Sequence, residues 1–478
     1  MNDEAPISRW PSAEAFYDER DDRTNRSALV FREYSARPVE VVIPSPWCKT
    51  LTGQRIALVA VNLAAKWARR VHLRVQGHPP LARDLAHFGP SGFIARALDE
   101  MRRSDPFGTF TAGEHPLSDT GVLRCIVAPD SSRDTAGDVG GVAAWASGWR
   151  ALLSDVGTLV PDVGRSATRA AAGIAAALAV GQLFKVAIGQ PSSSWITPVA
   201  WNLWSHELRY DAAPGEPVVD DADRIDVGRT LLGGVGAIGS AFVYLISLGP
   251  VTGTLGLLDG DFVDVSNLNR SPIFTVAHAL AGISKVEAAA TFLKPASIQI
   301  ERYAGWWNDV HPSVKRERWD CWISLTNERG VWSELPFHDP PTLLHATTTS
   351  GWGFGVGRHG SGDDCTRCRM PQERKAFRGP CAVGALPRPR SAEEPPRAAL
   401  PFLSVAAAAL LVGEFDRLRC GVATTDSPNQ ISADLLHGLS SPIAVARTRT
   451  EGCQGCDYLK RQANTLARGT PRFPQPQS

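Results

Sequence analysis

The stretch GGVGAIG at residues 233–239 limits how this chain can fold more than any other feature. It follows an apolar, strand-like run and opens the apolar, helix-like run AFVYLISLG. A G-x-G-x-x-G loop in this position lets the backbone turn tightly and approach a phosphate at the helix N-terminus. Gly234, Gly236 and Gly239 therefore predict an α/β unit that binds a nucleotide.

A carboxylate follows the loop at the spacing that a bound ribose needs. Asp259 ends the next predicted strand, TLGLLD, about twenty residues beyond Gly239, where its side chain can hold ribose hydroxyls. These features alone do not distinguish NAD from ATP. A glycine-rich turn with an aspartate at a strand end, without any ligand, is the structural alternative.

An amide and two cations lie further along the same segment, at Asn267, Arg270 and Lys285. A nicotinamide gains little from two cations, whereas a triphosphate needs them, because phosphoryl and nucleotidyl transfer depend on positioning and charge neutralisation. This set favours ATP and makes an NAD oxidoreductase the weaker alternative.

The pattern D-x-D-x-V-x-x-S-N-L-x-R at 259–270, followed by G-x-x-K at 282–285, resembles the adenylation domain of the ThiF/MoeB and ubiquitin-activating-enzyme superfamily. The resemblance implies that Asp259 binds ribose and that Asn267, Arg270 and Lys285 contact the phosphates of Mg-ATP. It extends over about 225–330 and returns near the cysteines. Asp261 is a further candidate cofactor ligand in the same pattern.

Two positions depart from the family pattern. Ser271 stands where the family has glutamine, and Thr326 stands where it has an aspartate that positions Mg²⁺. A hydroxyl is a much weaker Mg²⁺ ligand than a carboxylate. Asp261, Asp264 and Glu328 are the nearby acids that can take its place.

The chain also nearly repeats itself. RIALVAVNLAAK at 55–66 aligns with RTLLGGVGAIGS at 229–240, and AAALAVGQL at 175–183 aligns with AAALLVGEF at 407–415. We interpret both members of the first pair as a strand, a turn and the start of a helix. Two matches in the same order favour duplication over chance similarity of alanine-rich helices.

We therefore predict an α/β fold with two tandem Rossmann-like adenylation domains, an inactive first half at 1–200 and an active second half at 201–478. The aligned first loop lacks the glycines that a phosphate requires. Ubiquitin-activating enzymes likewise pair an inactive with an active domain, and related enzymes insert an arginine from the partner copy. Among Arg20, Arg23 and Arg26, Arg23 is the candidate here, with a solvated charged helix face as the alternative.

Two C-x-x-C pairs predict a metal site. Four thiolates at Cys365, Cys368, Cys453 and Cys456 suit a closed tetrahedral structural zinc, with a redox pair as the rival interpretation. The family resemblance implies the same zinc site. The metal would connect a loop within the second half to the C-terminal region.

Cys381 lies in a different setting, the Pro-, Gly- and Arg-rich segment ERKAFRGPCAVGALPRPR. Neighbouring cations lower a thiol pKa, and an exposed thiolate can capture an acyl group. In ubiquitin-activating enzymes such a cysteine forms a thioester with the activated partner, whereas a structural role for this cysteine is the alternative. We expect the remaining cysteines to be inert buried thiols; they are Cys48, Cys125, Cys321 and Cys420.

Bulk properties exclude several other classes. A net charge of +1 gives no footprint for nucleic acid. The acidic start MNDEAPISRW lacks a secretory pattern, and the apolar run at 170–189 is interrupted by Gln182 and Lys185, as in a buried helix. We expect a cytoplasmic protein with no membrane partner.

Together these features predict an ATP-dependent enzyme that activates the C-terminus of a ubiquitin-like protein, transfers it to a cysteine and passes it to a conjugating enzyme. Its cofactors would be ATP, Mg²⁺ and Zn²⁺, and the chain would be an internal pseudo-dimer that can form a higher assembly. The resemblance extends to bacterial ubiquitin-like conjugation (Bil) operons of antiphage defence. The alternatives are a sulfur-carrier-protein adenylyltransferase and a non-enzymatic scaffold whose site has decayed.

Overall fold

The computed structural model describes most of the chain. The described residues are 9–25, 32–88, 92–129, 141–155, 164, 166–190, 199–219, 223–326, 328, 330–338, 342–349, 351–360, 363–369, 399–421, 427–436 and 442–466. Structural statements below concern these residues.

Two mixed sheets organise the molecule. The first has the order β3-β2-β1-β4-β5-β6-β7, and the second has the order β10-β9-β8-β11-β12-β13-β14-β15. The strands of the first sheet are β1 Val39–Ile43, β2 Arg70–Val75, β3 Thr109–Gly113, β4 Leu123–Val127, β5 Gly141–Ser147, β6 Arg150–Asp155 and β7 Val199–Asn202. Those of the second are β8 Ile225–Gly233, β9 Val251–Asp259, β10 Gln299–Ala304, β11 Cys321–Ser324, β12 Leu343–Thr348, β13 Gly353–His359, β14 Gln430–Asp434 and β15 Ile443–Val445.

The two sheets follow the same plan. The first five strands of each order pair in parallel, and the next two pair antiparallel. A long helix precedes the last of these shared strands in each half, and β15 is an addition to the second sheet. The predicted α/β fold with two Rossmann-like sheets is confirmed.

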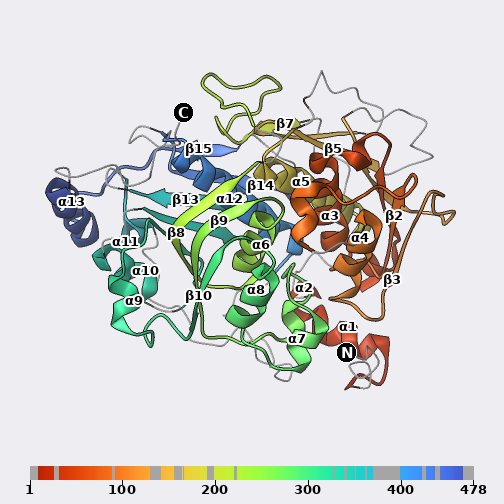
Figure 1. Ribbon diagram of the computed structural model, residues 1–478, viewed down its shortest axis with the longest axis horizontal. Coiled ribbons are helices and arrows are strands. Elements are labelled where there is room, and N and C mark those ends of the chain that lie inside the picture. Colours follow the sequence, from red (N-terminus) through yellow and green to blue (C-terminus); the bar gives the residue numbers. More distant parts are fainter. Residues whose placement is uncertain are drawn as a thin grey trace.

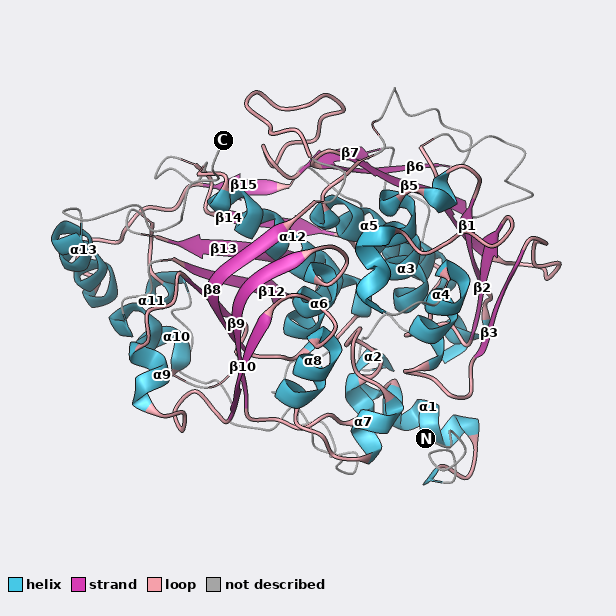
Figure 2. Ribbon diagram, in the orientation of Figure 1, coloured by secondary structure: helices cyan, strands magenta, loops and turns pink. Residues whose placement is uncertain are grey.

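Helices from both halves pack against one another between the two sheets (Figure 1, Figure 2). They are α3 Leu51–Ala64 and α5 Arg169–Ala187 from the first half, and α6 Ala237–Ile246 and α12 Pro401–Arg419 from the second. α5 contacts α3, α6 and α12, so the helices that carry the second repeated match are neighbours in the core. α5 is long and apolar enough to cross a membrane, but 89% of its most apolar window is buried inside the protein.

Shorter helices surround this core. They are α1 Ala13–Arg20, α2 Asp22–Asn25, α4 Phe93–Arg102, α7 Val276–Leu280, α8 Lys285–Leu293, α9 Pro312–Arg316, α10 Val331–Glu334, α11 Thr366–Arg369 and α13 Gln454–Leu466. In the described part of the chain, 3₁₀ helices accompany them at η2 Arg32–Ala36, η3 Trp47–Lys49, η4 Arg83–Phe88, η7 Val265–Asn267 and η8 Leu335–His338. The N-terminal helix α1 contacts η7 of the second half, which brings the start of the chain to the loop predicted to bind phosphate.

The first repeated match has a different structure from the one its sequence suggested. RIALVAVNLAAK does not form a strand and a turn, because residues 55–64 lie inside α3 and the true first strand is β1. All of α3 beyond Leu51 is buried, so its apolar residues surround the helix and give no helical period. The two halves correspond in topology, but the sequence alignment had the wrong register.

Candidate functional site: the glycine-loop cavity

A cavity of about 530 Å³ opens at the carboxyl ends of the strands of the second sheet. This is where open α/β sheets bind ligands. Its wall contains Gly234, Gly236, Gly239, Asp259, Asp261, Asn267, Arg270 and Lys285, together with Arg23 from the first half. Apart from Cys381 and the four cysteines, the structure therefore places every predicted site residue around one space.

The three glycines have different roles. Gly234 has φ +93, and a Cβ on it would lie 2.7 Å from the backbone of Leu325, so only glycine fits beside β11. A Cβ on Gly239 would lie 2.0 Å from the Gly234 carbonyl oxygen. A Cβ on Gly236 would meet no atom within 4 Å and would extend into the space where a ligand can approach.

The N-terminus of α6 suits an anion. Gly236 is its N-cap and provides no side-chain hydrogen bond, so the first backbone N–H groups of the helix face the cavity uncapped. Free N–H groups and the helix dipole both favour a negative ligand at this end.

The corresponding loop of the first half differs in just this respect. Thr50 is the N-cap of α3, and its hydroxyl accepts a hydrogen bond from Gly53 N at 3.1 Å. Gly53 matches Gly239, since a Cβ on Gly53 would lie 2.4 Å from the Trp47 carbonyl oxygen. The first half has therefore kept one glycine of the loop, contrary to our prediction, while its helix N-terminus is capped by its own chain.

Asp259 is fixed by the glycine loop. Its carboxylate accepts hydrogen bonds from Val235 N at 2.6 Å and Asp261 N at 2.8 Å. Burial raises the pKa of Asp259, and the positive charge of Lys285 opposes this shift. A carboxylate held rigidly at the strand end can accept hydrogen bonds from two adjacent hydroxyls of a ribose.

The cations lie on the other side of the loop. Lys285, the first residue of α8, forms an ion pair with Asp261 at 2.6 Å, and both side chains are almost fully buried. Arg270 donates to the Ser266 carbonyl oxygen and, at 2.9 Å, to Asn269 Oδ1. With Arg23, three positive groups thus line the cavity, and a bound polyanion would compete with Asp261 for Lys285.

The acids near Thr326 fall into two groups. Asp261 and Glu328 line the cavity, as Thr326 does. Asp264 instead caps η7 by accepting from Ser266 N at 2.9 Å. Of these three acids, Asp261 and Glu328 lie where a Mg²⁺ ion bound with a nucleotide would need a ligand, because hard cations prefer carboxylate oxygens. Glu328 also accepts hydrogen bonds from Trp307 N at 2.7 Å and Asn308 N at 3.1 Å.

Arg20 and Arg23, two of the N-terminal arginines, lie in different surroundings. Arg20 is not on a solvated helix face but is fully buried, with ion pairs to Asp21 and Asp105, each at 2.7 Å. Arg23 lines the cavity, and its carbonyl oxygen accepts from Ala399 N at 3.4 Å. Arg26 lies outside the described residues.

The four predicted metal-binding cysteines come together. All four Sγ atoms lie within 4.8 Å of one another, and neighbouring pairs are 3.5 to 3.7 Å apart. A tetrahedron of thiolates around zinc, with Zn–S bonds of about 2.3 Å, has S–S edges of about 3.8 Å. The residues Cys365, Cys368, Cys453 and Cys456 therefore fit a structural zinc.

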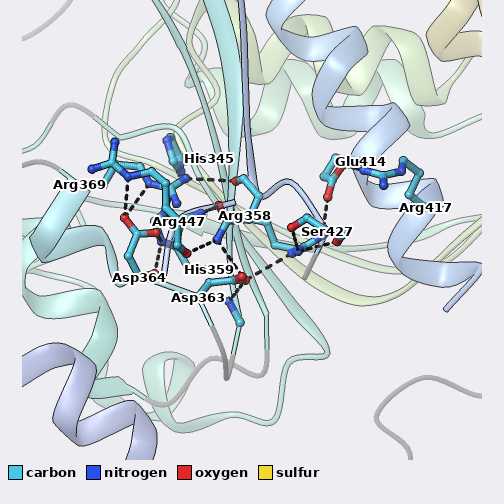
Figure 3. Close-up of polar contacts among 12 residues, drawn as sticks. His345, Arg358, His359, Asp363, Asp364, Arg369, Glu414, Arg417, Ser427 and Arg447 are labelled. Atoms are coloured by element: carbon cyan, nitrogen blue, oxygen red, sulfur yellow. Dashed lines mark hydrogen bonds and ion pairs between the residues drawn. The ribbon is translucent and has the colours of Figure 1, made fainter. Parts of the chain in front are cut away.

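A buried network beside this cluster was not evident from the sequence (Figure 3). Arg358 on β13 forms ion pairs with Asp363 at 3.3 Å and with Glu414 of α12 at 2.9 Å. His359 accepts or donates to His345 at 3.0 Å, and its other ring nitrogen lies 2.7 Å from the Asp364 carbonyl oxygen. Burial lowers the pKa of His345 to about 3, so this ring is neutral at physiological pH.

The other cysteines include one error of prediction. Cys48, Cys125 and Cys321 are buried, as expected, but Cys420 is exposed, because it ends α12 where the helix leaves the core. Cys381 lies outside the described residues.

Part of the chain that contains this cavity is similar to a known protein family. Residues 216–324 match the ThiF family model. This segment carries the glycine loop, Asp259, Asn267, Arg270 and Lys285.

Curated relatives match parts of the chain. An adenylyltransferase and sulfurtransferase MOCS3-1 of Zea mays is 28% identical over 161 residues, covering 32% of this chain and 33% of the relative. An adenylyltransferase and sulfurtransferase uba4 of Aspergillus terreus is 45% identical over 67 residues, covering 14% and 13%. The chain thus spans a third or less of the length of these relatives.

A solved structure of E. coli MccB with ATP is also similar. It is 18% identical, covers 48% of this chain and 67% of that chain, and has a TM-score of 0.35. This likeness is too distant to assign a function.

Proposed function

We propose that the second half binds ATP and adenylates the C-terminal carboxylate of a ubiquitin-like or sulfur-carrier protein. The observation that carries this proposal is the convergence of the uncapped α6 N-terminus, Asp259, Arg270 and Lys285 on one cavity within the segment that matches the ThiF family model. These groups bind a ribose and a polyphosphate together, and the curated relatives are named adenylyltransferases.

The chemistry follows from charge. A carboxylate oxygen of the substrate attacks the α-phosphorus of ATP, the bond from that phosphorus to its bridging oxygen breaks, and pyrophosphate leaves. Arg270, Lys285 and the N–H groups of α6 stabilise the negative charge that accumulates on the phosphates. A bound Mg²⁺, held by Asp261 or Glu328, would neutralise further phosphate charge.

We propose that the acyl-adenylate then transfers its acyl group to a cysteine, with Cys381 as the candidate. The thiolate attacks the acyl carbon and AMP leaves, which gives a thioester that a separate conjugating enzyme can accept. On the sequence resemblance alone, we assign this cytoplasmic pathway to a bacterial antiphage system.

A sulfur-carrier activator is the second candidate function. The two curated relatives named above are also named sulfurtransferases. The two functions differ in their product, because a sulfur carrier ends as a thiocarboxylate whereas a conjugated protein passes through a thioester to the enzyme.

Exchange of labelled pyrophosphate into ATP tests the adenylation step. The full chain is incubated with Mg-ATP, labelled pyrophosphate and each of a panel of purified ubiquitin-like and sulfur-carrier proteins. We expect exchange that depends on one member of the panel and is lost in Asp259→Ala. No exchange with any of them, together with no ATP binding by calorimetry, would refute the proposal.

The thioester step needs a separate assay. A covalent adduct that a reducing agent removes, and that is absent in Cys381→Ala, supports transfer to this cysteine. An adduct that persists in Cys381→Ala would place the thioester on another residue.

A further inference from the structure

The loop that carries Arg270 is tied to the first half of the chain through a chain of buried hydrogen bonds. Asn269 Nδ2 donates to Thr24 Oγ1 at 2.9 Å, and Arg270 Nη1 donates to Asn269 Oδ1 at 2.9 Å. Thr24 is 1% exposed, Asn269 0% and Arg270 7%. The contacts therefore connect α2, at the start of the chain, with the cavity wall of the second half.

Asparagine is well suited to the middle of this connection. Its amide donates through nitrogen and accepts through oxygen, so it can bind the threonine hydroxyl and the guanidinium at the same time. Both bonds are shielded from water, and a hydrogen bond to a charged group in such surroundings is stronger than one between neutral groups.

Thr24 has a fixed position because its own helix is anchored. Arg20 and Asp21, just before α2, belong to the buried ion network with Asp105 of the first half. Asn25 N donates to the Asp21 carbonyl oxygen at 2.8 Å, which continues the helical turn through Thr24. The position of the hydroxyl is thus set by the core of the first half.

The first half also holds the rest of the loop. Asn62 on α3 donates to the Pro272 carbonyl oxygen at 3.1 Å, and Val276 N donates to the Arg103 carbonyl oxygen at 3.0 Å. Residues 269–276 are therefore fixed at three points by residues that lie far away in the sequence.

We propose that Thr24 and Asn269 are positioning residues for Arg270, so that the first half sets the orientation of a phosphate-binding group of the second half. The two bonds of Arg270 Nη1, to Asn269 and to the Ser266 carbonyl oxygen, fix the plane of the guanidinium that lines the cavity. A fixed guanidinium binds phosphate without the entropy loss of ordering a free side chain. This inference rests on the proposed ATP site.

Measurements of ATP affinity by calorimetry on the full chain test whether Thr24 positions Arg270 through Asn269. Thr24→Val keeps the shape but removes the hydroxyl, and we expect it to raise the Kd for ATP by about tenfold. Thr24→Ser restores the acceptor and should return the Kd to within about twofold of the wild-type value. Thr275→Val is the matched control, since the Thr275 hydroxyl caps α7 in the same loop and has no bond to Arg270 among the described contacts.

A double-mutant cycle separates positioning from general stability. In the Arg270→Ala background, Thr24→Val should change the Kd by less than about twofold, because the group that Thr24 orients is gone. If Thr24→Val raises the Kd for ATP equally in both backgrounds, or leaves it unchanged in the wild-type background, Thr24 does not position Arg270. Either result would overturn this inference while leaving the proposed ATP site intact. Absence of ATP binding by the wild-type protein would instead refute the proposed function.

Discussion

At the scale of single residues, Gly236 and Gly239 belong to the same glycine motif but lack a side chain for different physical reasons. Gly239 lacks a Cβ because the loop backbone occupies that space, whereas Gly236 lacks one in front of an open cavity. Gly239 is required by the fold, whereas Gly236 leaves space in front of the cavity. The difference allows folding and binding to be changed separately.

Gly236→Ala should leave stability within about 0.5 kcal/mol of the wild type and weaken ATP binding by about tenfold or more, because its methyl group occupies the path of the phosphates. Gly239→Ala should lower the free energy of unfolding by about 1–3 kcal/mol, because its methyl overlaps a backbone carbonyl. Thermal unfolding and ATP calorimetry on both variants check this. A Gly236→Ala protein that binds ATP normally would show that the nucleotide does not approach this loop.

The residues of the cavity also show how far local sequence can predict a site. Asp259, Asn267, Arg270 and Lys285 were found because they lie within one strand–loop–helix segment, where spacing along the chain fixes spacing in space. Thr24 and Asn269 were not found, because their contact joins residues far apart in the sequence and depends on how two halves dock. Only tertiary structure contains that information.

At the scale of elements, the anchoring of α12 depends on a buried carboxylate. Glu414 lies between Arg358 of β13 and Arg417 of its own helix (Figure 3), and His206, which follows β7 of the first sheet, lies 3.4 Å from its carboxylate. Burial by itself would raise the pKa of Glu414, but the contact with His206 and the charges of Arg417 and Arg358 lower it to about 2. The carboxylate therefore connects α12 to β13 of the second sheet and to the segment that follows β7 of the first sheet.

Glu414→Gln should lower the free energy of unfolding at pH 7 by about 3 kcal/mol, since it removes the carboxylate that pairs with the buried Arg417 and leaves the buried Arg358 with Asp363 as its remaining ion-pair partner among the described contacts. A folded-state pKa below the ordinary value of 4.5 stabilises the protein above that pH, and this contribution is lost as the pH falls from 4.5 toward 2. Urea unfolding followed by tryptophan fluorescence at pH 7 and at pH 3.5 should therefore show a smaller difference between variant and wild type at the lower pH. The exposed Glu207→Gln is the control, and an equal difference at both pH values would contradict this account.

The four-cysteine cluster has its own prediction. The full chain should contain one zinc per molecule by elemental analysis, and Cys453→Ser should reduce this content and lower the thermal midpoint. ATP affinity should change little, because none of the four cysteines lines the glycine-loop cavity. A zinc-free protein of unchanged stability, with the thiols joined in disulfides, would favour the redox interpretation instead.

At the scale of the whole molecule, the sequence predicted the duplication but not the correct register between its copies. The match of α5 with α12 was right, because long buried helices of similar composition keep their alanine and glycine positions. The match of 55–66 with the glycine loop was wrong. The sequence of a short apolar run does not show whether it forms a strand or part of a buried helix. The shared order of strands, which sequence periodicity cannot supply, gives the correct correspondence of β1 with β8.

The docking of the two halves buries charged groups as well as apolar helices. Arg55 and Arg169 of the first half donate to the carbonyl oxygens of Leu248 and Ile246, at the C-terminal end of α6. Positive charge at this end complements the helix dipole whose other end faces the cavity. The first half thus contacts the C-terminal end of α6. Through Thr24 it also contacts the loop that carries Arg270, near the N-terminal end of α6.

Lys66 is a buried lysine of the first half. Burial of its positive charge should destabilise the folded protein by an amount that can be measured. It is 1% exposed, and its ammonium group has no hydrogen-bond partner among the described residues. Burial, followed by the charges of Arg103 and Arg20, lowers its pKa to about 7 from 10.5. Because the folded-state pKa is lower than the unfolded one, the protonated lysine destabilises the folded protein fully below pH 7, and the penalty declines as the pH rises from 7 toward 10.5.

Lys66→Met, which keeps the length of the side chain without its charge, should therefore raise the free energy of unfolding by roughly 1–3 kcal/mol at pH 6. The gain over the wild type should shrink at pH 9, where much of the wild-type lysine is already neutral in the folded state. Urea unfolding at both pH values measures the two differences, and Lys49→Met, at the exposed last residue of η3 before α3, is the matched control. A variant less stable than the wild type at pH 6 would mean that the acids Glu100 and Asp105 stabilise the ammonium by more than burial costs it.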